Sequence, residues 1–291
     1  MNPNVLNTLE PFRTEALRQD IPADEVDRWI ATALPCATLT QGGDGPVVGR
    51  FGGPAMAPPG TPHPGYPLIA TIDCAALPPG TTNLPLPSDG QLMLFGFPEP
   101  DETGSMGEAI YVPAGAVVEE MPIPEDSYER NEEDERSLAI CQDLPKGEIR
   151  LAMDVTLPSY GRVKVPGKMP GAPYPDFPHS PQLADAWLDT EQAITTRGLA
   201  RLGGYASRSD FGGRGPVEVA ASRAVRSQQR GYWQGTGAPA SPNFEDWVLL
   251  AEWHCDSQHL GGGADIYWAI QRDDLVARRF EGVYAIVFWN P

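Results

Sequence analysis

Short apolar runs separated by turn residues dominate the pattern along the chain. The runs are rich in aromatic and β-branched residues and are bounded by Gly and Pro, which is typical of antiparallel strands. We predict strands over residues 36–40, 47–51, 68–74, 90–97, 110–118, 148–157, 247–253, 265–270 and 283–289. Helical spacing of apolar positions marks 22–33 and 180–196, and leaves the helicity of 219–230 open. The sequence therefore predicts an α+β fold, mainly antiparallel β-sheet with few short helices, and a loosely attached polar segment over 1–21.

The two halves of the chain carry the same order of motifs. The first half contains FGG, LIATIDC and GQLMLFGF, and the second contains LGG, LLAEWHC and GADIYWAI. This alignment equates Phe51 with Leu202, Leu68 with Leu249, Asp73 with His254, Cys74 with Cys255, and Leu94 with Tyr267. Neither copy could bury its apolar face alone, so we predict two similar β-units that arose by internal duplication.

The expected division of the chain follows from this repeat. Residues 1–35 form an N-terminal segment and helix, and 36–157 form the first β-unit. Residues 158–200 form a proline-rich connection and a helix, and 201–291 form the second β-unit. We expect the two units to pack as one domain.

The same motifs resemble the YwqG-like family of bacterial proteins. FGG, LIATIDC and GQLMLFGF are similar to its first half, and LGGY, LLAEWHCDS, GADIYWAI and RDDLVARRFEGV are similar to its second half. The resemblance covers roughly residues 36–289. It implies an α+β fold in a cytoplasmic protein, no agreed activity, and an association of some members with toxin–immunity genes. The chain departs from the family's usual pattern at Glu252, His254 and Gly262.

Net charge changes the picture of function. At −18 the chain lacks the clustered cations of a nucleic-acid-binding surface, and it would be repelled by anionic lipid. No apolar window is long enough to span a membrane, and no secretory signal is present. Four scattered cysteines fit a reduced cytoplasm. The acidic window 119–137 is either a solvated loop or a patch for a cationic partner.

A cluster around residues 252–259 contains side-chain types that bind transition metals. Imidazole, thiolate and carboxylate groups occur at His254, Cys255, Asp256 and His259, beside Glu252. Strand alternation places Glu252, His254 and Asp256 on one face and Cys255 on the other, so His254 and Cys255 do not reach one ion. His254 and His259 remain metal candidates, but the chain offers no second cluster, and we predict no cofactor.

Acid–base chemistry is a separate hypothesis. Asp73, Glu252, His254 and Asp256 become catalytic candidates if the repeat brings the strand ends together, with Asp265 as a further carboxylate. The alternative is that Asp256 and Asp265 cap turns. The sequence shows no phosphate-binding loop, dinucleotide motif or GxSxG motif.

Aromatic residues in the loops of the second half suggest a binding surface. Tyr205 and Trp233 lie near several arginines, and Tyr, Trp and Arg are enriched at binding hot spots. Alternatively, these rings cover the sheet. We favour non-catalytic binding of a basic protein or peptide, such as an immunity-type inhibitor of a basic toxin. The alternative is an enzyme or small-ligand-binding protein with a site between the repeats.

Overall fold

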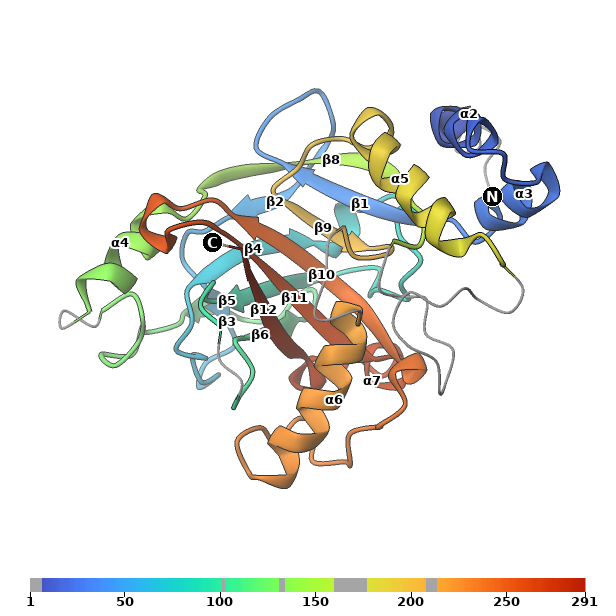
Figure 1. Ribbon diagram of the computed structural model, residues 1–291. Coiled ribbons are helices and arrows are strands. Elements are labelled where there is room, and N and C mark those ends of the chain that lie inside the picture. The colour runs from blue at the N-terminus through green and yellow to red at the C-terminus, as the bar shows by residue number, and fades with distance from the viewer. Residues whose placement is uncertain (1–6, 101–102, 131–133, 160–176, 208–213, 291) are drawn as a thin grey trace.

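The computed structural model describes residues 7–100, 103–130, 134–159, 177–207 and 214–290 (Figure 1). Ten strands form one antiparallel sheet. They are β1 (Leu34–Thr40), β2 (Val47–Phe51), β4 (Leu68–Asp73), β5 (Gln91–Gly96), β6 (Gly107–Val112), β8 (Gly147–Thr156), β9 (Ala200–Gly203), β10 (Trp247–Cys255), β11 (Gly263–Gln271) and β12 (Tyr284–Asn290). A separate ribbon pairs β3 (Met56–Ala57) with β7 (Glu119–Glu120). The predicted α+β fold with a mainly antiparallel sheet is confirmed.

Most strands lie where the apolar runs predict them, but β9 and the short strands β3 and β7 were not predicted, and one predicted strand has different bounds. The strand expected over 110–118 spans Gly107–Val112. It ends there because Pro113 has no N–H group to donate to a neighbouring strand.

Six helices are assigned within the described ranges. They are α2 (Glu10–Arg18), α3 (Ala23–Ile30), α4 (Glu135–Asp143), α5 (Ser180–Ile194), α6 (Pro216–Gln229) and α7 (Arg272–Val276). The expectation that 1–21 is loosely attached is wrong for α2, because Leu9, Phe12 and Ala16 are buried against α5. Residues 1–6 and most of the proline-rich connection, 160–176, lie outside the described residues. No helix among those described is long and apolar enough to cross a membrane.

The sheet curls until its two edge strands approach each other. The Met106 amide donates to the Ala285 carbonyl at 3.0 Å, which joins the approach to β6 with β12. Inside the curl, Trp268 Nε1 donates to the Phe95 carbonyl at 2.9 Å. Gly107 permits this contact, since a Cβ there would lie 2.3 Å from the Phe95 oxygen. The inner face of the sheet therefore forms one enclosed core.

Strand alternation divides the sheet into an inner and an outer face. The inner core takes residues from both halves, including Phe51, Leu94, Trp253, Trp268 and Val287. The outer face is covered by three separate groups. Helices α2, α3 and α5 cover the end of β8, α6 covers β10–β12, and the β3–β7 ribbon covers β4–β6 (Figure 1).

Strand order reads symmetrically outwards from the β1–β8 pair. It is β12-β11-β10-β9-β1-β8-β2-β4-β5-β6, so β1 pairs with β9 and β8 pairs with β2. Strands β4 and β10 each have a register shift near their first residues, at Leu68/Ala70 in β4 and at Leu249/Ala251 in β10. The ladder equates Leu94 with Trp268, because these residues pair with Ala70 and Ala251. The alignment of Leu94 with Tyr267 is therefore shifted by one residue from the pairing in the sheet. The duplication itself stays a prediction.

Candidate functional site

A row of three polar residues crosses the outer face of the sheet where the two halves meet. Thr38 on β1 lies opposite Arg201 on β9, and Arg201 lies opposite Glu252 on β10. Directly opposed residues of antiparallel strands place their side chains on the same face, with Cβ atoms about 5 Å apart. The row therefore brings together one residue from the first half and two from the second.

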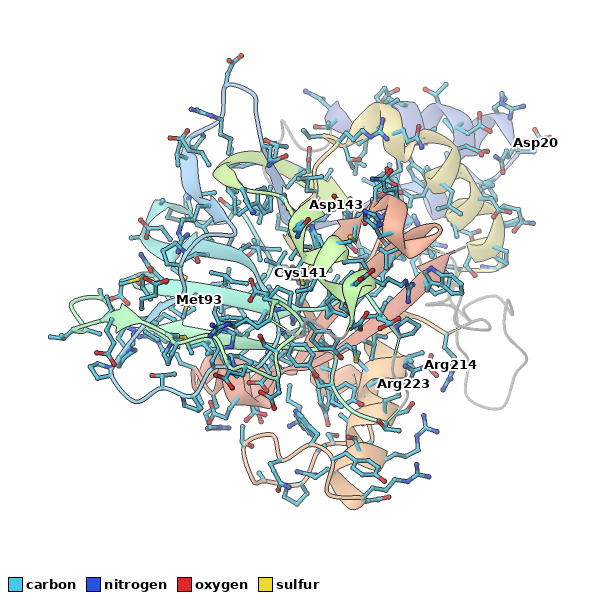
Figure 2. The ribbon with its side chains drawn as sticks, turned by 90° about the vertical axis from the view of Figure 1, so that its left-hand side faces the viewer. Asp20, Met93, Cys141, Asp143, Arg214 and Arg223 are labelled. Carbon is cyan, nitrogen blue, oxygen red and sulfur yellow. The ribbon has the colours of Figure 1, made fainter. Side chains whose placement is uncertain are left out.

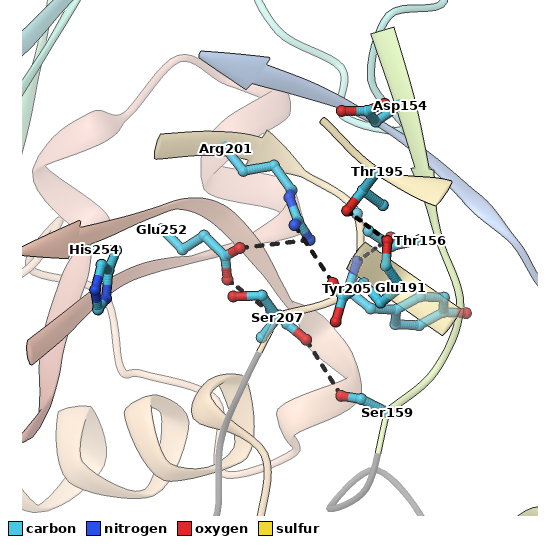
Figure 3. Close-up of polar contacts among 12 residues, drawn as sticks. Asp154, Thr156, Ser159, Glu191, Thr195, Arg201, Tyr205, Ser207, Glu252 and His254 are labelled. Atoms are coloured by element: carbon cyan, nitrogen blue, oxygen red, sulfur yellow. Dashed lines mark hydrogen bonds and ion pairs between the residues drawn. The ribbon is translucent and has the colours of Figure 1, made fainter. Parts of the chain in front are cut away.

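Arg201 is the buried centre of this row. Its side chain is 10% exposed and lies between two carboxylates, with Nη1 3.5 Å from Glu252 Oε1 and Nη2 3.5 Å from Glu191 Oε1 (Figure 3). Burial alone would lower the pKa of Arg201, but the negative charges, of which Glu252 is the strongest, raise it overall. These separations give ion pairs that are longer than an ordinary N–H···O hydrogen bond of about 2.9 Å. Within the described part of the chain, Nη1 has no hydrogen-bond partner.

The segment after β9 fixes the position of Glu252. Gly203 and Gly204 both adopt left-handed backbone conformations, with φ of 68° and 73°, and turn the chain after the strand. The turn is anchored by Tyr205, whose amide donates to Thr156 Oγ1 at 2.8 Å. The Ser207 amide then donates to Glu252 Oε2 at 2.9 Å. One carboxylate oxygen is thus held by the backbone, and the other faces Arg201.

A histidine–carboxylate pair lies beside the row. His254 and Asp265 are opposed on β10 and β11, and His254 Nδ1 is 2.8 Å from Asp265 Oδ1. The imidazole is 49% exposed, whereas Asp265 is largely buried. Cys255 points into the inner core, where burial raises the pKa of its thiol to about 12. The pair can orient and exchange a proton, but the neighbouring thiol does not supply a nucleophile at neutral pH.

These groups enclose a cavity of about 70 Å³. It is lined by Thr38, Thr196, Gly198, Leu199, Ala200, Arg201, Ser207, Glu252, Trp253, His254 and Asp265. Three residues of the lining have a buried side-chain polar atom without a hydrogen-bond partner among the described residues: Thr38 Oγ1, Arg201 Nη1 and Trp253 Nε1. The Trp253 side chain belongs to the inner core on the opposite face of the sheet, so Thr38 and Arg201 supply the unpartnered atoms on the outer face. Buried polar groups are nearly always satisfied by protein, water or ligand, so this cavity is the strongest candidate site.

The structure does not bring the other catalytic candidates to this cavity. Asp73 ends β4, which is separated from β10 by β2, β8, β1 and β9 in the sheet. It caps η1 (Cys74–Ala76), since its Oδ1 accepts a hydrogen bond from the Ala75 amide at 3.0 Å. Asp256 is exposed after the end of β10. Of the four predicted catalytic residues, only Glu252 and His254 therefore share the site.

The two predicted metal ligands have different partners. His259 lies on η3 (Gln258–Leu260), and its Nε2 is 3.8 Å from Asp143 Oδ2 on α4, whereas His254 pairs with Asp265. Figure 2 labels Asp143 near the end of α4. Among the residues that the structure describes, no group of three or more His, Cys, Asp or Glu side chains could hold a metal ion.

The two predicted partner-binding aromatics also lie apart. The Tyr205 hydroxyl donates to the Thr32 carbonyl at 3.0 Å, beside α3. Trp233 Nε1 donates to the Val283 carbonyl at 3.2 Å, and its ring packs edge-on against Tyr284. The Trp233 ring therefore packs on the outer face of the sheet under α6, and the Tyr205 hydroxyl is bound to the chain that follows α3. A role of either ring in binding stays a prediction.

A larger cavity of about 340 Å³ lies between the β3–β7 ribbon and α4. Its polar lining includes His63, Glu129, Cys141 and Lys146. Burial raises the pKa of Glu129, lowers that of His63, and raises that of Cys141 to about 12 (Cys141 is labelled on α4 in Figure 2). No side-chain polar atom lining this cavity is both fully buried and unpaired in the described structure.

The sequence indicated Arg201 only as one of several arginines near Tyr205 and Trp233, and it did not indicate Glu191. A signal for the arginine exists, because R-F-G-G at 50–53 and R-L-G-G at 201–204 repeat the same four-residue pattern. The two arginines are used differently, since Arg50 donates to the carbonyl oxygens of Gly52 and Pro54 and turns back on its own loop. No repeated pattern in the sequence marks Glu191 on α5.

Comparison with known proteins assigns the chain to a family. No curated protein matches it. A family model covers the sheet from β2 to β12, including Arg201, Glu252 and the His254–Asp265 pair. Because residues 49–288 match this model, the chain belongs to the family described as a domain of unknown function (DUF1963).

Proposed function

We propose that the chain binds a peptide or protein partner without catalysing a reaction, and that the Arg201 cavity is part of the binding surface. The size and polarity of this cavity carry the proposal. Its volume of about 70 Å³ is far below the roughly 300 Å³ of the smallest pockets that enclose a whole small molecule. Its buried donors nevertheless require a polar partner. A small end group on a much larger ligand meets both conditions.

The charge around the cavity supports a basic partner. Glu191 offsets the charge of Arg201 from the side of α5, while Glu252 and Asp265 line the cavity itself. The chain as a whole carries −18, which accelerates encounter with cationic molecules. An immunity-type role toward a basic toxin, a cytoplasmic location and the YwqG-like name are finer predictions that accompany this proposal.

The His254–Asp265 pair supports a second candidate, acid–base catalysis on a ligand bound at the same cavity. A histidine oriented by a carboxylate is a common general base. Catalysis by this pair requires a bound ligand whose reacting group lies within hydrogen-bond reach of the His254 imidazole.

An array of immobilised peptides with varied charge tests the proposed function. We expect basic peptides to bind the protein in preference to acidic ones, and binding to weaken as salt is added. His254→Ala should reduce binding by about tenfold, whereas His259→Ala, an exposed histidine on η3 outside the cavity, should bind like the parent.

The same peptides, incubated with the protein in solution and followed by mass spectrometry, separate the two candidates. Unchanged peptide masses are expected for a binding protein. Conversion of a peptide that His254→Ala abolishes would replace the binding proposal with the catalytic one, and absence of binding to any peptide would reject it.

A further inference from the structure

Two buried donors point into the Arg201 cavity from neighbouring strands. Arg201 is 8% exposed and Thr38 is 2% exposed, and each has a side-chain atom without a hydrogen-bond partner in the described structure. Because the two residues are directly opposed, their side chains start about 5 Å apart on one face. A single acceptor oxygen placed between them can accept from both.

Two carboxylates line the cavity on its other side. Glu252 Oε1 is held only by the 3.5 Å contact with Arg201, while its Oε2 is occupied by the Ser207 amide. Asp265 uses Oδ1 for His254, and its Oδ2 has no partner among the described residues. The cavity thus presents hydrogen-bond acceptors and negative charge beside the two donors.

From this arrangement we infer that the cavity receives the free N-terminal residue of a peptide, an inference that rests on the proposed function. The α-ammonium group donates to Glu252 and Asp265, and the first carbonyl oxygen accepts from Arg201 Nη1 and the Thr38 hydroxyl. The small volume of the cavity limits the first residue of the peptide to Gly, Ala or Ser.

Other end groups satisfy only part of the site. A lysine side chain supplies an ammonium group but no acceptor, so Arg201 Nη1 and Thr38 Oγ1 stay unpaired. A peptide carboxylate supplies acceptors but is repelled by Glu252 and Asp265. An acetylated N-terminus lacks the cation and adds atoms where space is smallest. Only a free amine next to a carbonyl matches donors, acceptors and charge together.

Thr38→Val provides the sharpest test of the donor side. Val keeps the shape of Thr and removes a hydroxyl that has no hydrogen-bond partner among the described residues, so the unfolding midpoint should be unchanged or higher. Affinity for a free N-terminus should fall by about two- to twelvefold, the equivalent of one net hydrogen bond. Thr71→Val is the matched control, because Thr71 lies on β4, is 6% exposed and also has an unpaired Oγ1. It should leave affinity unchanged.

The probes are pentapeptides anchored through their C-termini, each beginning with Gly, Ala or Ser and containing one Lys, presented with a free or an acetylated N-terminus. The lysine keeps both forms cationic. We expect acetylation to reduce binding by more than about tenfold. Equal binding of both forms, or equal losses in Thr38→Val and Thr71→Val, would overturn the inference but leave the proposed function standing. No binding of either form would overturn both.

Discussion

Replacement of Arg201 by Met should destabilise the fold through the two carboxylates that it leaves behind. The guanidinium is 10% exposed, and the carboxylates of Glu191 and Glu252 are 14% and 9% exposed. Removing one partner of a buried ion pair costs about 3–5 kcal/mol, mostly because the remaining charge is buried without compensation. Met fills a similar volume, so little of this loss should come from a cavity.

Urea unfolding followed by circular dichroism measures this loss directly. We expect the free energy of unfolding of Arg201→Met to fall by about 3–5 kcal/mol. Addition of Glu252→Gln should restore about 1–2 kcal/mol, because the second change removes the charge of the carboxylate that faced Arg201 Nη1. Arg50→Met, at the corresponding ladder position, should lose only about 1–2 kcal/mol, since Arg50 donates to carbonyl oxygens at a part-exposed site.

Two results would refute a buried electrostatic unit at Arg201: a cost of less than about 1 kcal/mol for Arg201→Met, or a further loss of stability when Glu252→Gln is added to that variant. Either result would mean that solvent reaches the carboxylates and that the row is not a buried electrostatic unit. Arg201 Nη1 would then be hydrated and would not need an acceptor from a ligand in the cavity.

Three further predictions concern the glycine at the closure of the sheet and the four cysteines. Gly107→Ala should cost about 1–3 kcal/mol in urea unfolding, because the added Cβ would lie 2.3 Å from the Phe95 oxygen. Gly104→Ala is the control and should be neutral, because its Cβ would meet nothing within 4 Å. Equal effects of the two substitutions would contradict the close packing at Gly107. Burial raises the pKa of Cys36, Cys141 and Cys255 to about 12 and of Cys74 to about 11, so iodoacetamide at pH 8 should label them at least about 100-fold more slowly than in urea. Because folding favours the protonated thiols, stability should fall as the pH rises above 9, and fast labelling of any one thiol in mass spectra would show that its burial is misassigned.

The strands themselves were predictable because their signal is local. Alternation and β-branched composition located β4, β5, β8, β10, β11 and β12 to within a few residues. Alternation also separated the residues correctly between the two faces of β10, with Trp253 and Cys255 in the core and Glu252 and His254 outside. Helix α2 was missed because its apolar face consists only of Leu9, Phe12 and Ala16 within an otherwise polar stretch.

The site was only half predictable. Glu252 and His254 stood out by residue type near a strand end, but so did Asp73, which lies across the sheet and caps a turn. Residue type alone does not separate these cases, because a carboxylate that caps a turn and one that faces a buried cation look alike in sequence.

The sequence by itself determined most of the strands, the two faces of β10 and the strong negative charge, since each depends on neighbouring residues or on composition. The tertiary structure alone decided that β1 pairs with β9 and β8 with β2, and hence that Thr38 meets Arg201. It also brought Glu191 from α5 to the same guanidinium. Backbone hydrogen bonds between strands are the same for almost any pair of apolar strands, so the choice of neighbour depends on the packing of the whole core.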